Sequence, residues 1–424
     1  MNQERLQRWS YTATTVSPLH IGTGEEMTPL EYHIGNDLIV PDLDKIFSKY
    51  PAEVERFSQN LARVSSSDLA RTRLSSLLDR KILEDQHVWR YSMPAIRNSA
   101  TRFDSLNRLK NEIAREHGKI KLAIKSPDYR AYIPGTSLKG AFKTAWAYNQ
   151  CLKTPRLLET VLAKLKEHGS RIEKNAEQVL MASVFQAPAQ PKDAAYDIFR
   201  VLQIGDSQPR KADDVMILVA ERVLSAGIYA SDPPAPAATA SASYKTYWVF
   251  CEAIDENLVF SGLLAVDQGL LNDSSARRLM GWNDAQLGLS VTNLCQAANK
   301  FAADLCEFEI EYFDSLQPDE RNYDAEAVIN FYLDLRESIA DVPANMCFLP
   351  LGHGSGWHKL TIGLLIEKKL SLVEFAEMRR ATNLARQHTQ FIFPKSRKLV
   401  MDGERSACSP LGWLKLEFTP EQSR

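Results

Sequence analysis

The sequence has few of the features that mark metal-binding, disulfide-rich or membrane proteins. Its six cysteines are scattered without a C-x-x-C pair, so neither a zinc ribbon nor a disulfide framework is predicted. No apolar run reaches the roughly 18 residues of a membrane span, and the polar start lacks the apolar segment of a secretory signal. We therefore expect a cytoplasmic protein that binds no membrane, no metal and no cofactor. Two-metal nuclease spacing is also missing among the candidate aspartates, Asp42, Asp44, Asp206 and Asp402.

A strong net charge is missing as well. The formal net charge is −2, so any nucleic-acid site must be a local patch and not a property of the whole surface. Charge is nevertheless segregated, because the stretch 97–143 is rich in Lys and Arg while the stretch 304–326 is acidic. Solvated faces of ordinary helices explain each run equally well.

The chain is long for a single ordinary core. At 424 residues we expect two domains, or one domain that carries large insertions. A tract rich in Pro, Ala, Thr and Ser has the composition of a flexible loop. It divides the chain into three predicted parts: an N-terminal domain over 1–230, this loop over 231–243, and a C-terminal α/β region over 244–424.

Predicted strands and helices are interspersed along the chain. Strands are expected over 9–16, 120–124, 215–223, 244–254, 258–266 and 411–418, with a hairpin around the turn 35–37. Helical patterns occupy 43–61, 97–117, 155–185, 286–301 and 325–338. Because no regular βαβα alternation is present, the predicted class is α+β with an antiparallel sheet. The order of elements fits a ferredoxin-like β-α-β-β-α-β core with helical insertions.

One stretch, Tyr132–Ala145, has the pattern of a strand end, a turn and a helix start. Pro134-Gly135 ends the extended segment, and the hydroxyl of Thr136 or Ser137 is expected to cap the helix. Apolar residues then recur at helical spacing and predict one buried face, formed by Leu138, Phe142, Ala145 and Trp146.

Lys139 and Lys143 share another face of this predicted helix, within its first turns. A helix N-terminus already carries a partial positive charge, so two ammonium groups there are unfavourable by themselves. The arrangement becomes favourable if a phosphate lies over the turn and is held by backbone N–H groups, the hydroxyls and both lysines. Gly135 and Gly140 would then let a nucleotide backbone approach. The alternative is an ordinary capped amphipathic helix with solvated lysines.

A second glycine-rich segment, Leu351–Lys359, lies near the C-terminus. Its spacing is G-x-G-x-G and differs from a dinucleotide fingerprint. Trp357 and Lys359 offer a base-stacking ring and a cation, as single-stranded RNA sites do, although a tryptophan packed in the core is an equal alternative. Positive φ angles and N–H groups that converge on a phosphate are expected at Gly352, Gly354 and Gly356.

Three motifs together resemble the RAMP superfamily of CRISPR interference proteins, and within it the family of fifth Csm subunits of type III-A effectors. Ile133–Ala141 is similar to the superfamily's proline-glycine-serine-leucine-lysine-glycine signature. Ser17–Gly24 is similar to its opening glycine loop, and Leu351–Trp357 is similar to its C-terminal glycine-rich loop. Shorter likenesses near residues 199–207 and 393–413 extend the resemblance over most of the chain.

The resemblance implies a fold related to the RNA-recognition motif and a non-catalytic subunit that caps the 3′ end of the guide RNA and assists its maturation. The partners implied are guide RNA, other RAMP subunits of the Csm effector, and host nucleases. Contacts should reach phosphate and sugar, because the guide's spacer varies in sequence. The residues expected at the RNA are Gly22, Gly24, Gly135, Thr136, Ser137, Lys139, Gly140, Lys143, Gly352, His353, Gly354, Ser355, Gly356, Trp357 and Lys359.

Three other functions stay open from the sequence. A metal-independent, guide-processing endoribonuclease would use His353 with Lys359 or Lys139 as acid and base. A RAMP subunit at the 5′ end of the guide would share the glycine loops. A scaffold that mainly docks other proteins would use the acidic run 304–326. Asp206 is expected to be a turn residue or a partner of Arg200.

Overall fold

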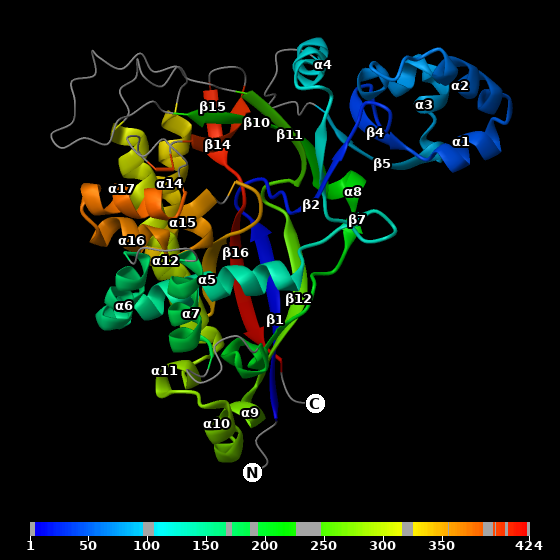
Figure 1. Cartoon of the computed structure of the whole chain (residues 1–424). Helices are drawn as coiled ribbons and strands as arrows, with labels where there is room; N and C mark the ends of the chain where they lie inside the picture. Colours follow the sequence, from blue (N-terminus) through cyan, green and yellow to red (C-terminus); the bar gives the residue numbers. More distant parts are fainter. Residues whose placement is uncertain are drawn as a thin grey trace.

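The computed structural model of the chain describes residues 5–95, 106–166, 172–186, 194–225, 247–315, 325–354, 356–384, 393–394, 396–402 and 406–421 (Figure 1). Two large β-sheets lie at its centre, and most helices gather on one side of them (Figure 1). The predicted flexible loop over 231–243 lies outside the described residues.

The first large sheet has the ferredoxin-like strand order. In spatial order its strands are β13 (Met346–Pro350), β16 (Trp413–Pro420), β1 (Leu6–Thr15), β12 (Val259–Asp267) and β8 (Leu202–Ile204), each antiparallel to its neighbour. Apart from the edge strand β13, the main elements follow the chain order β1, α5 (Gly135–Lys153), β8, β12, α12 (Val291–Ser315), β16. The predicted α+β class with a β-α-β-β-α-β core is confirmed.

The second large sheet continues the first. Its strands are, in spatial order, β15 (Ser406–Pro410), β14 (Ser396–Asp402), β10 (Met216–Ser225), β11 (Tyr247–Ile254), β6 (Ile120–Ala123) and β2 (Gly22–Met27). Neighbours are antiparallel except β11 and β6, which are parallel. Residues 255–258 carry the chain from β11 into β12, so these consecutive strands belong to different sheets. Strands from both sides of the predicted 231–243 boundary share both sheets, and the division into two domains stays a prediction.

Helix α5 crosses the face of the first sheet (Figure 1). Its predicted apolar face is buried, and the Phe142 ring centre lies 6.1 Å from that of Phe418 on β16. Tyr148 packs against α12, with its ring centre 4.9 Å from that of Phe301, and its hydroxyl donates to Asp304 Oδ2 at 2.9 Å. The helix is therefore fixed to both the sheet and its partner helix.

A small subdomain near the N-terminus has its own core. The three-stranded sheet of β3 (His33–Ile34), β4 (Asp37–Pro41) and β5 (Trp89–Pro94) contains the predicted hairpin. The predicted helix over 43–61 is split into α1 (Leu43–Lys49) and α2 (Ala52–Ala62), because Pro51 lacks the N–H that a continuous helix needs. Short turns follow, namely η1 (Leu69–Arg71), η2 (Leu74–Ser76), α3 (Arg80–Leu83) and η3 (Gln86–Val88).

The remaining elements complete the helical side and the edges. The longer ones are α4 (Leu106–Arg115), α6 (Pro155–Leu165), α7 (Ile172–Val184), α10 (Ser274–Met280), α14 (Glu326–Ala340), α16 (Gly363–Lys369) and α17 (Leu372–Ala381). The shorter ones are β7 (Arg130–Ala131), η4 (Ala194–Tyr196), η5 (Ile198–Val201), β9 (Arg210–Lys211), α8 (Ala212–Val215), α9 (Gln268–Asn272), α11 (Asp284–Leu287) and α15 (Gly356–Leu360). Within the described ranges, none of the helices combines the length and the apolar character that crossing a membrane requires.

Candidate nucleic-acid interface

The N-terminus of α5 is capped from a distant part of the chain. The Gly135 N–H donates a hydrogen bond of 2.8 Å to Asp206 Oδ1, and Pro134, at the cap position, makes no side-chain bond. The predicted cap by Thr136 or Ser137 is wrong, because the helix begins at Gly135 and both hydroxyl residues lie inside its first turn. A carboxylate at this end also complements the positive helix terminus.

Asp206 belongs to a short segment that follows β8 and clamps the residues before α5. Ser207 N–H donates to Ile133 O at 3.0 Å, and Ile133 N–H donates to Ser207 Oγ at 2.8 Å. The alternative prediction that Asp206 pairs with Arg200 is wrong, since the Arg200 guanidinium donates to the backbone oxygen of Ala195.

The two glycines of the α5 signature have different surroundings. A Cβ on Gly135 would lie 2.1 Å from Ile204 O and 2.8 Å from Gly205 O, so Gly135 lets the helix start approach the backbone after β8. Gly140 is exposed, and a Cβ there would meet nothing within 4 Å. Close packing inside the protein therefore accounts for Gly135, whereas Gly140 leaves an open patch on the helix surface.

Both lysines of this helix contact groups of the chain itself. Lys139 Nζ donates to Leu202 O at 2.8 Å, and Lys143 forms an ion pair with Asp197 while its ammonium lies 4.6 Å from the Phe185 ring centre. Burial lowers the pKa of Lys139, the Asp197 carboxylate opposes this, and the Lys143 ammonium adds to it. A phosphate at this turn would compete with these internal contacts, so the lysine cradle stays a prediction.

Glycine segments from the two ends of the chain meet. The His353 N–H donates to His20 O at 2.8 Å, and the Gly412 N–H donates to Pro18 O at 2.9 Å. Gly352 has a φ of 76°, and a Cβ on it would lie 2.4 Å from His20 O. Only glycine allows this approach, so Gly352 joins the two segments.

Gly22 and Gly24 lie in β2, at an edge of the second sheet, and not in the loop that was predicted. The pairing of β2 with β6 is irregular between Gly22 and Glu26, and Gly24 has a φ of 90°. Both glycines are exposed, and a Cβ on Gly24 would meet nothing within 4 Å. An irregular sheet edge of this kind can present backbone N–H groups to an oxyanion.

Two imidazoles and the buried Glu221 carboxylate lie at this junction. The His20 and His353 rings meet edge to face, with centres 5.3 Å apart. His353 Nε2 lies 2.9 Å from Glu221 Oε2 and 3.2 Å from Lys398 Nζ. His20 Nδ1 donates to Glu252 O at 2.6 Å, and burial lowers the pKa of His20 to about 4 although this hydrogen bond opposes the shift. His20 is therefore a neutral group that holds the two segments together.

A cavity of about 160 Å³ opens beside the C-terminal glycine segment. Glu309 is the only carboxylate among its described lining residues, and it is paired with Arg397 at 2.6 Å, so the cavity keeps an excess of positive charge. Gly354 and Gly356 have φ angles of 84° and 62°, which turn backbone groups in directions that other residues rarely adopt. The described polar and glycine residues that line it are Glu309, Tyr332, Gly354, Gly356, His358, Lys359, Ser396, Arg397 and Lys398.

Trp357 and Lys359 are packed against other side chains. The Trp357 ring centre lies 5.9 Å from that of Phe375 and 5.3 Å from that of Phe393. Lys359 is only 6% exposed, its ammonium lies 5.4 Å from the Trp413 ring centre, and burial lowers its pKa. These are the contacts of the packing alternative, and base stacking by Trp357 stays a prediction.

The family is decided by comparison with known proteins. A family model described as the RAMP superfamily matches residues 12–325, well over half of the chain. The chain belongs to the RAMP superfamily. This agrees with the resemblance of its three glycine motifs.

Individual relatives of this RAMP protein are Csm5 proteins. The CRISPR system protein Csm5 of Mycobacterium tuberculosis is 24% identical over 223 residues, which cover 50% of this chain and 58% of that relative. The match thus spans little more than half the relative's length. A chain in the cryo-EM structure of a type III-A Csm–crRNA–target RNA ternary complex matches with a TM-score of 0.61 and 22% identity, over 96% of this chain and 100% of that chain. T. onnurineus Csm5 matches with a TM-score of 0.58 and 21% identity, over 95% and 99% of the two chains. At such identities the structures show a shared fold.

The predicted site residues of this RAMP protein fall into three groups by exposure. The exposed ones are Gly22, Gly24, Thr136, Gly140 and Gly356. The partly buried ones are Ser137, Lys139, Lys143, Gly352, His353, Gly354 and Trp357, and the buried ones are Gly135 and Lys359. Ser355 lies outside the described residues. The glycine segments around His20 and His353 come together, whereas the start of α5 is anchored at the end of β8.

A buried ion pair below the glycine segments was missed at the level of sequence. Glu252 on β11 is fully buried, accepts from Tyr91 Oη at 2.6 Å and from the Ala123 N–H at 2.9 Å, and pairs with Lys125. Burial lowers the pKa of Lys125, and the Glu252 carboxylate opposes that shift. A single glutamate inside an otherwise apolar strand was the available signal, because a charge buried there needs a partner.

The acidic run over 304–326 is partly internal. Asp304 accepts from the Tyr148 hydroxyl, and Glu309 pairs with the buried Arg397. These carboxylates fix α12 in place, and residues 316–324 lie outside the described ranges. A docking surface would therefore have less negative charge here than the sequence indicates.

Proposed function

We propose that this RAMP protein is a non-catalytic RNA-binding subunit of a type III-A CRISPR ribonucleoprotein, which caps the 3′ end of the guide RNA and assists its maturation. The main support is the meeting of glycine segments from both ends of the chain beside a cavity with excess positive charge. The similarity to Csm5 proteins supports the type of subunit. The partners in this proposal are the guide RNA, neighbouring RAMP subunits of the Csm effector, and host nucleases.

Binding in this site would be to the RNA backbone. Backbone N–H groups at Gly354 and Gly356 and the ammonium of Lys398 can hold phosphate oxygens without reading a base. Such contacts serve guides of any sequence, and their strength falls as salt rises because counterions are released on binding.

The test compares Lys398→Ala with Lys415→Ala, a partly buried lysine on β16 that does not line the cavity. Fluorescence anisotropy would measure the Kd of the full chain for two guide-length RNAs of unrelated sequence at several salt concentrations. Lys398→Ala should raise the Kd for both RNAs several-fold. It should also reduce the slope of log K against log salt concentration by about 0.7, the value for one phosphate contact to a single strand. Unchanged binding by Lys398→Ala at every salt concentration would contradict the backbone site.

The end of the guide can be tested separately. A photoreactive uridine at the 3′ end or at the 5′ end of the guide would be cross-linked in the assembled complex. Cross-links to this subunit from the 3′ end support the capping role. Cross-links from the 5′ end alone would instead make it the RAMP subunit at that end.

An endoribonuclease is the second candidate, and the contacts of His353 are the observation in its favour. Its imidazole lies beside His20, Glu221 and Lys398, a set that can move a proton. The pairs expected from the sequence differ, because Lys139 and Lys359 have other contacts. Guide precursor incubated with the full chain in chelator should remain intact. Cleavage that His353→Ala abolishes would overturn the non-catalytic proposal.

A further inference from the structure

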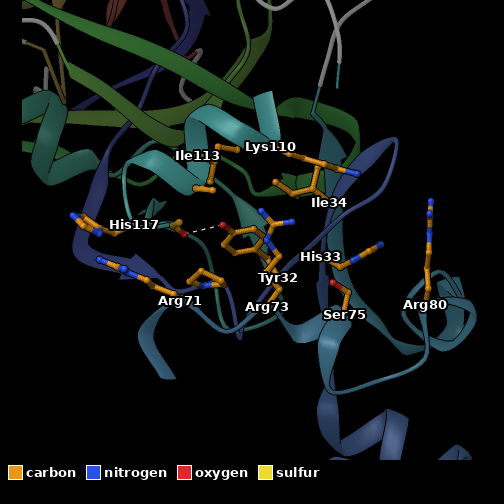
Figure 2. Close-up of a pocket in the computed structure, with 13 residues that line it drawn as sticks. Tyr32, His33, Ile34, Arg71, Arg73, Ser75, Arg80, Lys110, Ile113 and His117 are labelled. Atoms are coloured by element: carbon orange, nitrogen blue, oxygen red, sulfur yellow. Dashed lines mark hydrogen bonds between the residues drawn. The ribbon is translucent and has the colours of Figure 1, made fainter. Parts of the chain in front are cut away.

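A second basic pocket lies between the N-terminal subdomain and α4, and its described lining residues differ from those of the cavity beside Gly354 (Figure 2). Its volume is about 420 Å³, within the range of small-molecule sites. Its walls come from α4, from the segment 29–34 and from the segment 71–80. The basic and imidazole side chains that line it are His33, Arg71, Arg73, Arg80, Lys110 and His117.

The cations of this pocket are only partly neutralised. Arg80 pairs with Glu84 at 2.7 Å, but none of the described residues that line the pocket is a carboxylate. Among the described residues, Arg71, Arg73 and Lys110 form no ion pair. Burial lowers the pKa of Lys110, Arg80 and Arg73 lower it further, and Glu84 opposes them. Like charges that are gathered without counter-charges cost stability, which is expected where an anion binds.

His33 gives an independent sign of a ligand. Its side chain is only 8% exposed, and its Nε2 makes no hydrogen bond among the described residues; its charged neighbour there is Glu84 Oε1, at the ion-pair distance of 3.8 Å. A buried polar nitrogen that makes no hydrogen bond is unfavourable. Figure 2 shows His33 on the same side of the Tyr32 ring as Lys110. An oxyanion in the pocket would supply the hydrogen bond that His33 Nε2 lacks.

Apart from Ser75, the rest of the described lining is mainly apolar. The Tyr32 hydroxyl donates to Gly118 O at 2.7 Å, which holds its ring at the centre of the pocket (Figure 2). Pro29, Ile34 and Ile113 line the same space. The pocket thus joins a cationic side to an apolar side, as a nucleotide with its phosphate and base requires.

We propose that this pocket binds one phosphate-bearing nucleotide of a single RNA strand, with its phosphate on Arg73, Lys110 and His33. The nucleoside lies against Tyr32 and Ile113. This inference rests on the proposed RNA-binding function and adds a second contact, in a pocket whose described lining residues differ from those of the cavity beside Gly354. A free nucleotide has the same chemistry, and the test distinguishes the two sources.

The test uses the full chain, a labelled single-stranded RNA, and two double variants with the same change of charge. Arg73→Ala with Lys110→Ala removes two pocket cations, and Arg63→Ala with Lys81→Ala removes two exposed cations of the same subdomain outside the pocket. The pocket variant should bind RNA about tenfold more weakly or worse, because charge-assisted hydrogen bonds are lost. The control variant should bind as the parent does. Lys110→Arg, which keeps the charge, should retain most of the affinity.

Stability and a second ligand make each outcome decisive. In urea, the pocket variant should be at least as stable as the parent, because repulsion is relieved; a large loss of stability would show that the cations are structural and overturn the site. Equal RNA affinity of the pocket and control variants would also overturn the pocket as an RNA site. In that case, weaker RNA binding by Lys398→Ala would still support the proposed RNA-binding function. Calorimetry with AMP tests whether the pocket binds a free nucleotide instead. If AMP binds and RNA does not, the assignment to RNA is overturned. If neither binds, the pocket is not a nucleotide site.

Discussion

Alanine at Gly135 and at Gly140, in the same helix, should change the stability of the protein in opposite directions. A Cβ on Gly135 would lie 2.1 Å from Ile204 O and 2.8 Å from Gly205 O. Both are backbone atoms that cannot rotate away, so α5 or the end of β8 must shift. Overpacking of this kind costs about 1–3 kcal/mol, and the closeness of the two oxygens leads us to expect about 3 kcal/mol for Gly135→Ala.

Gly140 differs because it is exposed and a Cβ there would meet nothing within 4 Å. A glycine inside a helix costs about 0.5–1 kcal/mol relative to alanine, so Gly140→Ala should raise the free energy of unfolding by that amount. The two variants should therefore differ by about 4 kcal/mol, although each adds a single methyl group to the same helix.

Urea denaturation followed by circular dichroism measures this difference, with an unchanged m-value as the sign that only stability has changed. If Gly135→Ala unfolds at the parent's urea concentration, α5 does not approach β8 as described. If Gly140→Ala lowers the free energy of unfolding, other atoms of the protein must lie against Gly140, contrary to the structure. RNA binding can be measured on the same variant. If the RNA backbone contacts the open surface at Gly140, Gly140→Ala should bind RNA more weakly although it is more stable.

Three further perturbations address the contacts behind the site. Asp206→Ala should lower the free energy of unfolding by about 1 kcal/mol because α5 loses its cap, and Asp206→Asn should restore most of this in urea denaturation; equal stability of all three would contradict the cap. Lys125→Ala leaves Glu252 charged and buried and should cost about 3–5 kcal/mol, whereas Lys125→Ala together with Glu252→Gln should cost less, and a double variant at least as unstable as the single one would argue against the pair. Burial lowers the pKa of His20 from 6.5 to about 4. Between these two pH values, His20 therefore binds a proton in the unfolded chain but not in the folded chain. Stability should be complete above about pH 6.5 and fall by up to about 3 kcal/mol toward pH 4; a His20→Gln variant with the parent's pH dependence would refute this.

The sequence predicted elements best where the signal is local. The apolar spacing in α5 identified its buried face, because a helix places every third or fourth residue on one side. The turn over 35–37 predicted the β3–β4 hairpin, and the sequence of strands and helices predicted the ferredoxin-like core. The error in the helix over 43–61 was also local, since Pro51 was present to indicate the break.

Contacts between distant segments were not predictable in this way. The cap of α5 comes from Asp206, and the ammonium of Lys139 is bound by Leu202 O. Neither partner lies near the helix in sequence. Spacing alone predicts that Lys139 and Lys143 face either a phosphate or solvent. Their internal contacts cannot be predicted in this way, because Asp197 and Leu202 become their neighbours only when η5 and β8 pack beside α5.

The sequence by itself determined most of the elements, the three glycine motifs and the resemblance to the family, because propensities, spacing and motifs are properties of neighbouring residues. The tertiary structure alone decided that glycine segments from both ends of the chain meet at His20 and His353. It also decided that Gly135 serves internal packing, and that cations from α4 and from the segment 71–80 surround one pocket. The physical reason is that burial, pairing and charge density depend on which distant segments become neighbours.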